Sequence, residues 1–454
     1  MTTTARQSPT PPPPDPNASF QRKPIMKSHH YGLRARLGIA LVAVTALLAA
    51  CGQNNATTAP SGPVTITFLS YTYGQANPVG DGLKKLIADF EAANPNITVH
   101  PQSVPVADAL TKLQSEVVAG NPPDVAQIGW SKVAQASKTL PLRSFEDITS
   151  ADDWQTTMAG FVPSVLKATP TAGAKKPVSM PFLMATPVIF YNADLFRAAG
   201  LDPSQPPKTM AQLKQAALAI TEKTDAEGVY VSAADPGKSD YLTQSLVNSA
   251  GGALVSGSGE ITVDSAPVIT ALSTVQDLTK SGAQPAVDFA SAQSAFSSGK
   301  LGMLITTAGG LLTLDQAAKG KFGLQVAPFP TFDNLPARPT FSGSGLTILA
   351  KDSAKAQASW KFVQFLTNDE SFKLIASQMG YLPLRTSAAS AADPRLGSAV
   401  HQLADLVPYT AFPGKQSNQG VVVLQDEAVE PIVLRGADPA ATLRAAAVKI
   451  RSLN

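Results

Sequence analysis

The sequence has little cysteine and little histidine. Cys51 is its single cysteine in 454 residues, so no disulfide can form within the chain. Only His100 and His401 lie beyond residue 50, which argues against a histidine-rich metal site. The apolar run at 37–50 has 14 residues, and a membrane-spanning helix needs about 20. We therefore expect no disulfide framework, no metal site and no cofactor.

The chain also lacks a basic excess outside its first 50 residues. The formal net charge is +3, but residues 1–50 hold six Lys/Arg and one acid. The remaining 404 residues carry 30 basic and 32 acidic side chains, a net charge of −2. A nucleic-acid partner would want a basic patch, so none is expected. A length of 404 residues suggests two domains.

The N-terminus has the pattern of a secretory signal. Lys27, Arg34 and Arg36 precede the apolar run, and small residues follow it. Leu48–Cys51 (LAAC) resembles the lipobox of bacterial lipoproteins, which implies cleavage before Cys51, acylation of Cys51 and a membrane-anchored protein in the cell envelope. Residues 1–50 would then be leader and signal peptide, and 51–62 a flexible tether. The alternative is an inert cysteine at the end of a short helix.

The sequence offers two candidate start codons. Residues 11–16 (PPPPDP) form a polyproline segment that cannot pack a core. Signal peptides seldom carry such a leader, so Met26 is an alternative start to Met1.

Strand and helix patterns alternate along the rest of the chain. Period-two and period-3.6 patterns predict strands at 64–69, 97–100 and 124–128 and helices at 82–94 and after Asp108, the expected N-cap. The pattern then restarts, with strands at 187–191 and 228–232 and helices at 193–199 and 208–224, the last capped by Thr209. This order predicts the α/β class with parallel neighbours.

Five stretches carry a resemblance to one family. They are VSMPFLMATPVIFYNADLFRAAGLDPSQPPKTMAQLKQAALAI, SAFSSGKLGMLITTAGG, FGLQVAPFP, SGSGLTILAKDSAKAQASWKFVQFL and MGYLPLR. In this order they resemble extracellular solute-binding proteins of family 1, the substrate-capturing subunits of ABC importers. Within that family the chain most resembles sugar-binding and glycerol-3-phosphate-binding proteins.

The resemblance implies the two-lobe periplasmic-binding-protein type II fold. The ligand cleft would lie between lobes formed by 63–184 with 343–386 and by 185–342 with 387–454, and the chain would cross between them several times. Binding would close the lobes about a hinge. The implied partners are a sugar or polyol, an ABC permease and, through it, ATPase subunits, and the protein is expected to be a monomer.

Candidate binding residues come from two sources. Tyr71 and Tyr73 follow the first predicted strand, and Trp130 and Ser131 follow the third, where α/β sheets place their ligands. The alternative for these residues is a surface or core position. The resemblance adds Ala185, Tyr241, Thr307, Ser342, Gly343, Tyr381 and Lys415.

The same resemblance bears on the ligand. By this resemblance, Trp130 stands where glycerol-3-phosphate binders carry an acid, which implies a stacking platform. Their phosphate-clamping arginine has no clear counterpart, and Lys415 would offer a point charge at best. We therefore expect a neutral sugar, an oligosaccharide by preference. Glycerol 3-phosphate or a glycerophosphodiester is the alternative.

An enzyme is the rival from another class. S-x-x-K tetrads occur at Ser164–Lys167 and Ser297–Lys300, as in serine β-lactamases, but no companion S-D-N or K-T-G accompanies them. No G-x-S-x-G or Walker motif is present. A secreted hydrolase is thus the weaker hypothesis, and a structural envelope lipoprotein is a third hypothesis.

Overall fold

The computed structural model describes residues 62–169, 176–234 and 239–453. Cys51, the predicted signal peptide and nearly all of the predicted tether lie outside these ranges. Every helix within the ranges is too short or too polar to span a bilayer.

The first sheet has the strand order β2-β1-β3-β9-β4. Its strands are β1 (Val64–Ser70), β2 (Ile97–Ser103), β3 (Val125–Gly129), β4 (Met180–Ala185) and β9 (Ser342–Ile348). β1 pairs in parallel with β2 and β3, whereas β9 runs antiparallel to β3 and β4. The three strands predicted here are confirmed. β4 (MPFLMA) was not predicted, because it contains no β-branched residue, whereas the equally buried β5 contains Val188 and Ile189.

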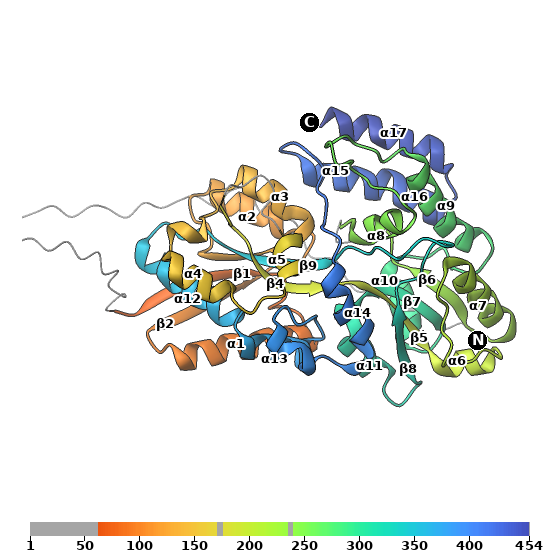
Figure 1. Ribbon diagram of the computed structural model, residues 1–454, viewed down its shortest axis with the longest axis horizontal. Helices are drawn as coiled ribbons and strands as arrows, with labels where there is room; N and C mark the ends of the chain where they lie inside the picture. The colour runs from red at the N-terminus through yellow and green to blue at the C-terminus, as the bar shows by residue number, and fades with distance from the viewer. Residues whose placement is uncertain (1–61, 170–175, 235–238, 454) are drawn as a thin grey trace, which may run out of the picture. The chain divides into compact units, whose positions relative to one another are not determined.

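Helices from the early part of the described chain and from residues 353–374 flank this first sheet (Figure 1). They are α1 (Pro78–Ala93), α2 (Ala109–Val118), α3 (Trp130–Thr139), α4 (Ala151–Met158), α5 (Pro163–Ala168), α12 (Ser353–Leu366) and α13 (Asp369–Leu374). α1 begins earlier than predicted, because the Asn77 side chain accepts hydrogen bonds from the Val79 and Gly80 amides at 3.1 Å. The predicted Asp108 cap was wrong: its backbone is already helical and its side chain makes no capping bond.

The second sheet has the order β6-β7-β5-β8. Its strands are β5 (Pro187–Asn192), β6 (Glu227–Val231), β7 (Leu301–Thr307) and β8 (Leu324–Pro328). β6 and β7 are parallel, and β5 is antiparallel to β7 and β8. The predicted strands at 187–191 and 228–232 are confirmed to within one residue at each end.

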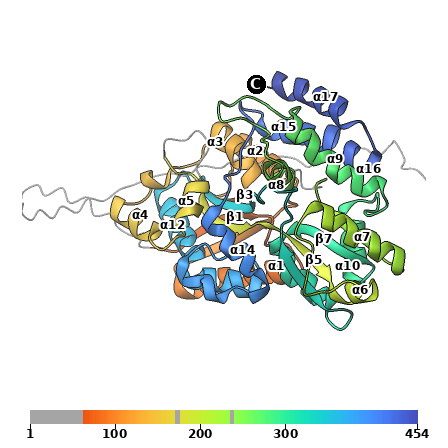
Figure 2. The same ribbon diagram turned by 45° about the vertical axis from the view of Figure 1, so that its right-hand side comes forward.

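The helices around the second sheet come from the middle and the end of the chain. They are α6 (Ala193–Ala198), α7 (Met210–Lys223), α8 (Tyr241–Ser249), α9 (Ala266–Lys280), α10 (Phe289–Ser297), α11 (Leu311–Ala318), α14 (Gly397–Gln402), α15 (Ser417–Leu424), α16 (Glu430–Arg435) and α17 (Pro439–Ser452). Figure 2 shows α15, α16 and α17 beside α9. Thr209 caps α7 as predicted, accepting a 3.1 Å bond from the Gln212 amide.

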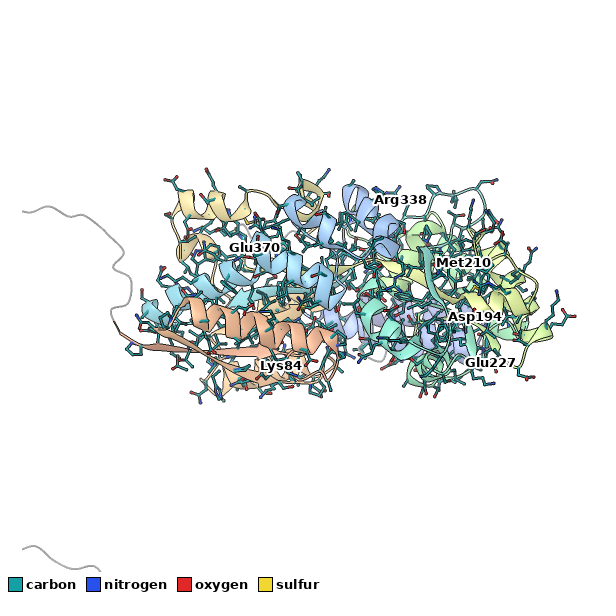
Figure 3. The ribbon with its side chains drawn as sticks, turned by 90° about the horizontal axis from the view of Figure 1, so that it is seen from below. Lys84, Asp194, Met210, Glu227, Arg338 and Glu370 are labelled. Atoms are coloured by element: carbon teal, nitrogen blue, oxygen red, sulfur yellow. The ribbon has the colours of Figure 1, made fainter. Side chains whose placement is uncertain are left out.

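Two apolar clusters fill the interior, and β5 separates them. Val188 and Phe190 belong to the cluster that includes the first sheet. Ile189 and Tyr191 point the other way, into a cluster with α7, α9 and α17. We call the part built on the first sheet the first lobe and the part built on the second sheet the second lobe. In Figure 3, Lys84 and Glu370 lie in the first lobe and Asp194, Met210 and Glu227 in the second.

The chain passes between the sheets more than once. Thr186 alone separates β4 from β5, and residues 329–341 lead from β8 back to β9. The chain passes once more to the second lobe between α13 and α15. The lobe ranges stated from the sequence stay a prediction.

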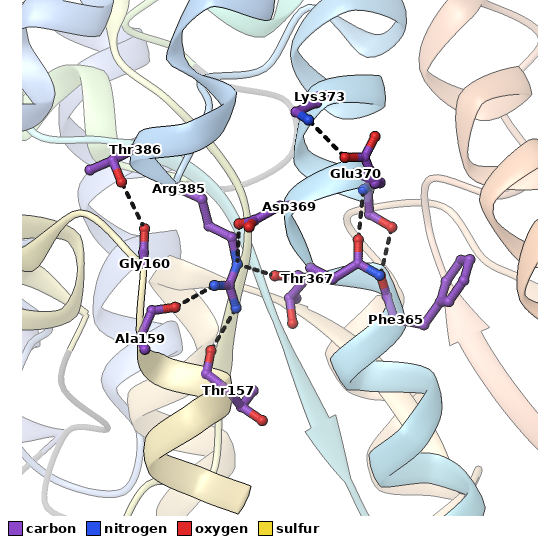
Figure 4. A network of polar contacts seen from close by, with 12 residues as sticks. Thr157, Ala159, Gly160, Phe365, Thr367, Asp369, Glu370, Lys373, Arg385 and Thr386 are labelled. Carbon is purple, nitrogen blue, oxygen red and sulfur yellow. Dashed lines mark hydrogen bonds and ion pairs between the residues drawn. The ribbon is translucent and has the colours of Figure 1, made fainter.

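A buried arginine holds the segment that follows α13 (Figure 4). The Arg385 guanidinium donates to Thr367 O at 2.6 Å and to the Thr157 and Ala159 carbonyls at 2.5 Å. Thr367 and Ala159 are the residues that end α12 and α4, so the arginine satisfies carbonyls at the C-termini of two helices. The guanidinium also lies 4.4 Å from the centre of the Phe161 ring. Residues 380–384, which include Tyr381, are thereby anchored to the first lobe.

Candidate ligand-binding site

A cavity of about 340 Å³ lies between the lobes. Its volume is near the lower end of the range of about 300–1,000 Å³ for small-molecule sites. Residues of both lobes line it, and eight of them were predicted from the sequence: Tyr71, Trp130, Ser131, Tyr241, Thr307, Ser342, Gly343 and Tyr381. Whether they contact a ligand stays a prediction.

The ends of strands bring these residues together. Tyr71 directly follows β1 and Trp130 directly follows β3. The carboxyl ends of these two strands lie at the same edge of the first sheet, because β1 and β3 are parallel. Thr307 ends β7 in the second sheet, and Ser342 begins β9. The cavity is thus at the edge where open α/β sheets place ligands.

A bonded polar network supports the wall formed by the first lobe. Gln127 is buried in β3 and donates through Nε2 to Thr72 Oγ1 and Ser344 Oγ, both at 2.9 Å. Its Oε1 accepts from Ser70 Oγ at 2.7 Å, which fixes the orientation of the amide. Burial raises the pKa of Tyr71 well above its usual value, although hydrogen bonds with Ser344 and Gln127 oppose the rise. The Tyr71 hydroxyl therefore stays protonated and can donate to a ligand oxygen.

Trp130 is held on three sides. Its indole N–H donates to Leu183 O at 3.3 Å, and its ring meets Phe341 edge to face at a centroid distance of 5.8 Å. A Cβ on Gly345 would lie 3.1 Å from the ring. Because the residue is only 7% exposed, it presents a small part of its ring to the cavity.

Tyr381 reaches from the first lobe to the second. The amide of the next residue, Leu382, donates to Met184 O at 2.9 Å and fixes this segment against β4. The Tyr381 ring lies against Gly309, where an added Cβ would come within 2.9 Å of it. Burial raises the pKa of Tyr381 to about 12, so this hydroxyl is also protonated at neutral pH.

Two hydroxyls and a glycine mark the crossing at β9. Thr307 Oγ1 and Ser342 Oγ are 2.8 Å apart and hydrogen-bond between the lobes. Gly343 has φ +117°, and a Cβ there would be 2.0 Å from Leu183 O. Only glycine fits this close approach of two backbones.

Tyr409 was not predicted, and it comes with a buried acid. Its ring lines the cavity and its hydroxyl donates to Asp240 Oδ1 at 2.5 Å. Gln244 Nε2 donates to Asp240 Oδ2 at 3.0 Å. Burial raises the pKa of Asp240 in spite of these two bonds, and burial together with Asp240 raises that of Tyr409. Four of the chain's eight tyrosines thus line this one cavity.

Sequence reasoning missed further lining residues: Gln75, Val106, Ala109, Leu110, Gln127, Ile128, Gly129, Lys132, Ser232, Ser239, Phe289, Thr306 and Phe341. Lys132 is the charged side chain among the described lining residues; it is buried, and its Nζ donates to Val106 O at 3.0 Å. Gly129 and Lys132 adjoin Trp130 and Ser131, so the same strand-end signal could have found them. Phe289 and Tyr409 lie in segments without such a signal.

Three predicted residues do not line the cavity. Tyr73 packs against the core of the first lobe, because Ser70 Oγ accepts from its amide at 3.1 Å and turns the chain there. Ala185 is fully buried in β4, and its carbonyl accepts from Ser342 Oγ at 3.3 Å. Lys415 is exposed in the turn before α15. These three residues lie outside the cavity lining, and whether they contact a ligand stays a prediction.

The S-x-x-K tetrads also lie away from the cavity lining. Ser164 Oγ donates to Leu403 O, and Lys167 is exposed. Lys300 is exposed, and Ser297 is not among the lining residues. In the described ranges, no three His, Cys, Asp or Glu side chains gather where they could hold a metal ion.

Curated relatives match part of the chain. It is 28% identical over 244 residues to the sn-glycerol-3-phosphate-binding periplasmic protein UgpB of Pectobacterium atrosepticum, a match that covers 50% of this chain and 53% of the relative. The corresponding protein of Yersinia pseudotuberculosis is 27% identical over 243 residues, with the same coverage. The chain therefore spans about half the length of the curated relatives it matches.

Solved structures match nearly all of the described chain. The GacH receptor of Streptomyces glaucescens, solved unliganded and with acarbose, has a TM-score of 0.73 at 24% identity and covers 86% of this chain and 98% of its own. UgpB from Mycobacterium tuberculosis in complex with glycerophosphocholine has a TM-score of 0.73 at 22% identity, covering 87% and 98%. These likenesses confirm the predicted α/β, two-lobe type II periplasmic-binding fold.

The model of one protein family matches residues 73–371, which is well over half of the chain. The matched span runs from the end of β1 to α13, and it holds both sheets' central strands and most of the cavity wall. The chain belongs to the bacterial extracellular solute-binding protein family.

Proposed function

We propose that this protein is the solute-binding subunit of an ABC importer and that it captures a sugar outside the cytoplasmic membrane for delivery to the permease. The observation that carries the proposal is the cavity between the lobes, where aromatic rings and hydroxyl or amide groups converge. Membership of the family supports the transport role.

The chemistry of the cavity suits a neutral sugar. Tyr71, Tyr241, Tyr381 and Tyr409 offer ring faces for stacking and, at Tyr71 and Tyr381, protonated hydroxyls. Ser131, Thr306 and Thr307 add hydroxyls that can bond those of a sugar. The modest volume favours a short sugar over a long oligosaccharide. Several structural neighbours were solved with such ligands, among them maltose and mannobiose.

A glycerophosphodiester is the second candidate, and Lys132 is the observation that favours it. A buried ammonium beside the cavity would attract a phosphate. The named function of the UgpB relatives points the same way. We rank this candidate second, because Lys132 already donates to Val106 O and because no described arginine lines the cavity to bind phosphate bidentately.

We further propose that acylated Cys51 anchors the protein to a membrane and that it works as a monomer. Its place would be outside the cytoplasm, which the family supports.

A thermal-shift screen of residues 52–454 against sugars, polyols and glycerophosphodiesters tests the proposal. Ligand at a hundred times its dissociation constant adds about 2.7 kcal/mol of stability, which raises the melting temperature measurably. We expect a shift with a short sugar and no turnover of chromogenic glycosides. A shift with glycerophosphodiesters alone would make the second candidate correct, and turnover would favour the hydrolase.

A further inference from the structure

Helix α3 begins at the cavity and continues to the second lobe. Its first residues, Trp130 to Lys132, line the cavity. One and two turns later, Gln135 and Lys138 lie on one face of the helix at a spacing of three. Gln135 Oε1 accepts a hydrogen bond from the Asn418 amide at 2.9 Å, and Lys138 Nζ donates to Gly414 O at 3.1 Å.

These two hydrogen bonds join different lobes. α3 packs on β3 and β9 of the first sheet. Gly414 and Asn418 lie between Phe412 and Val421, which belong to the core of the second lobe, and α15 packs against α17. Separating the lobes at α3 and α15 must therefore break both bonds.

We propose that this α3–α15 contact is a latch: Gln135 and Lys138 stabilise the closed conformation and thereby set ligand affinity, although neither residue lines the cavity. The physical basis is linkage. When the binding-competent conformation is only partly populated, the apparent dissociation constant rises in proportion to the missing fraction. The latch goes beyond the proposed function, because it acts on any ligand that the closed cavity holds.

Two buried oxygens beside the contact lack a hydrogen-bond partner among the described residues. They are Ser417 Oγ and Asn418 Oδ1, at the start of α15. A buried unpaired oxygen opposes the gain from neighbouring bonds.

Distances between spin labels test the latch without any ligand. Labels at Lys84→Cys on α1 and Glu227→Cys on β6, both exposed and in different lobes, are placed in the full chain with Cys51→Ser, so that these are its two cysteines. Gln135→Ala with Lys138→Ala is expected to change the ratio of the two interlobe distance populations about tenfold, the effect of losing two ordinary hydrogen bonds.

Two further variants keep the test decisive. Lys138→Ala alone changes one exposed side chain and is expected to give a smaller shift in the same direction. Thr139→Ala, exposed on the same helix and bonded only to the Gln135 carbonyl of that helix, is the control and should change nothing. Distance distributions that are the same in the double variant, in Lys138→Ala and in the control would overturn the latch.

Discussion

The two lobes meet in two different ways. Near the crossings, the contact is close: Gly309, which follows β7 of the second lobe, lies against the ring of Tyr381, which is anchored to the first lobe. At the α3–α15 contact, the lobes are joined by two hydrogen bonds, beside two unpaired oxygens. The first kind of contact leaves no room for a single methyl group. The two hydrogen bonds of the second kind can be replaced by hydrogen bonds to water. The difference suggests that the lobes pivot at the crossings and part at α3 and α15.

The largest expected effect is at the crossing itself. Gly343→Ala would place a Cβ 2.0 Å from Leu183 O on a backbone with φ +117°. Strain of this kind costs about 1–3 kcal/mol, and the backbone clash adds to it, so the free energy of unfolding should fall by about 3 kcal/mol or more. Urea denaturation measures it. Gly257→Ala, where no atom lies within 4 Å of the new Cβ, is the control and should be nearly neutral.

The next effect is on affinity, at Trp130. Trp130→Ala removes a ring that lines the cavity and bonds Leu183 O beside the crossing. Loss of stacking, about 0.5–1.5 kcal/mol, together with lost apolar area should weaken sugar binding about tenfold or more in calorimetry.

A substitution at a tryptophan outside the cavity tells an effect on sugar affinity from an effect on protein stability. Trp154→Ala is the control variant. Trp154 lies in the first lobe away from the cavity, where its ring stacks on that of Phe145 at a centroid distance of 5.7 Å. It should lower stability and leave affinity unchanged. Equal affinities for Trp130→Ala and the wild type would remove Trp130 from the site.

Gly309 offers a finer test of the crossing contact. Gly309→Ala would press a methyl group to 2.9 Å from the Tyr381 ring, which must move. We expect affinity to fall several-fold, at a stability cost of about 1–3 kcal/mol, as for other overpacked sites. Gly310→Ala is the matched control, because its Cβ would make only an ordinary contact, 3.8 Å from Leu314. If both variants bind the sugar with the same affinity, the contact between Gly309 and the Tyr381 ring does not determine the shape of the cavity.

The smallest effect is a pH dependence that comes from Asp240. Burial raises its pKa in the folded protein, so its contribution to stability is lost as pH rises from near 3.8 through the folded pKa. Asp240→Asn cannot ionise. The melting temperature of the variant minus that of the wild type should therefore increase between pH 4 and pH 7. A difference that stays constant across this range would contradict the raised pKa.

Most of the fold could be predicted from the sequence, because most strands and helices show a clear periodicity of apolar residues. The strands at 64–69, 187–191 and 228–232 alternate or end at turn residues, and the capping hydroxyl of Thr209 was recognisable. β4 was not predictable in this way, since it lacks the β-branched residues that mark the equally buried β5. Asn77 was also overlooked, although an Asn-Pro pair before a helix is a capping signal.

The site was accessible only where a strand end or a family motif pointed to it. Tyr71 and Trp130 follow strands, and Tyr381 stands in a quoted motif. Tyr409 comes from a connecting segment whose path depends on packing, here on its bond to Asp240, 169 residues away. Phe289 begins α10, and the position of that helix beside the cavity also depends on packing. Lys415 was taken from the family resemblance alone; it is exposed outside the cavity lining, and its contact with a ligand stays a prediction.

The most direct test of the account is a calorimetric titration of the wild-type protein with the sugar that gives the largest thermal shift and with glycerophosphocholine. The account predicts saturable one-to-one binding of the sugar, weakened by Trp130→Ala and not by Trp154→Ala, with little heat from glycerophosphocholine. Saturable binding of glycerophosphocholine with no binding of any sugar would contradict it.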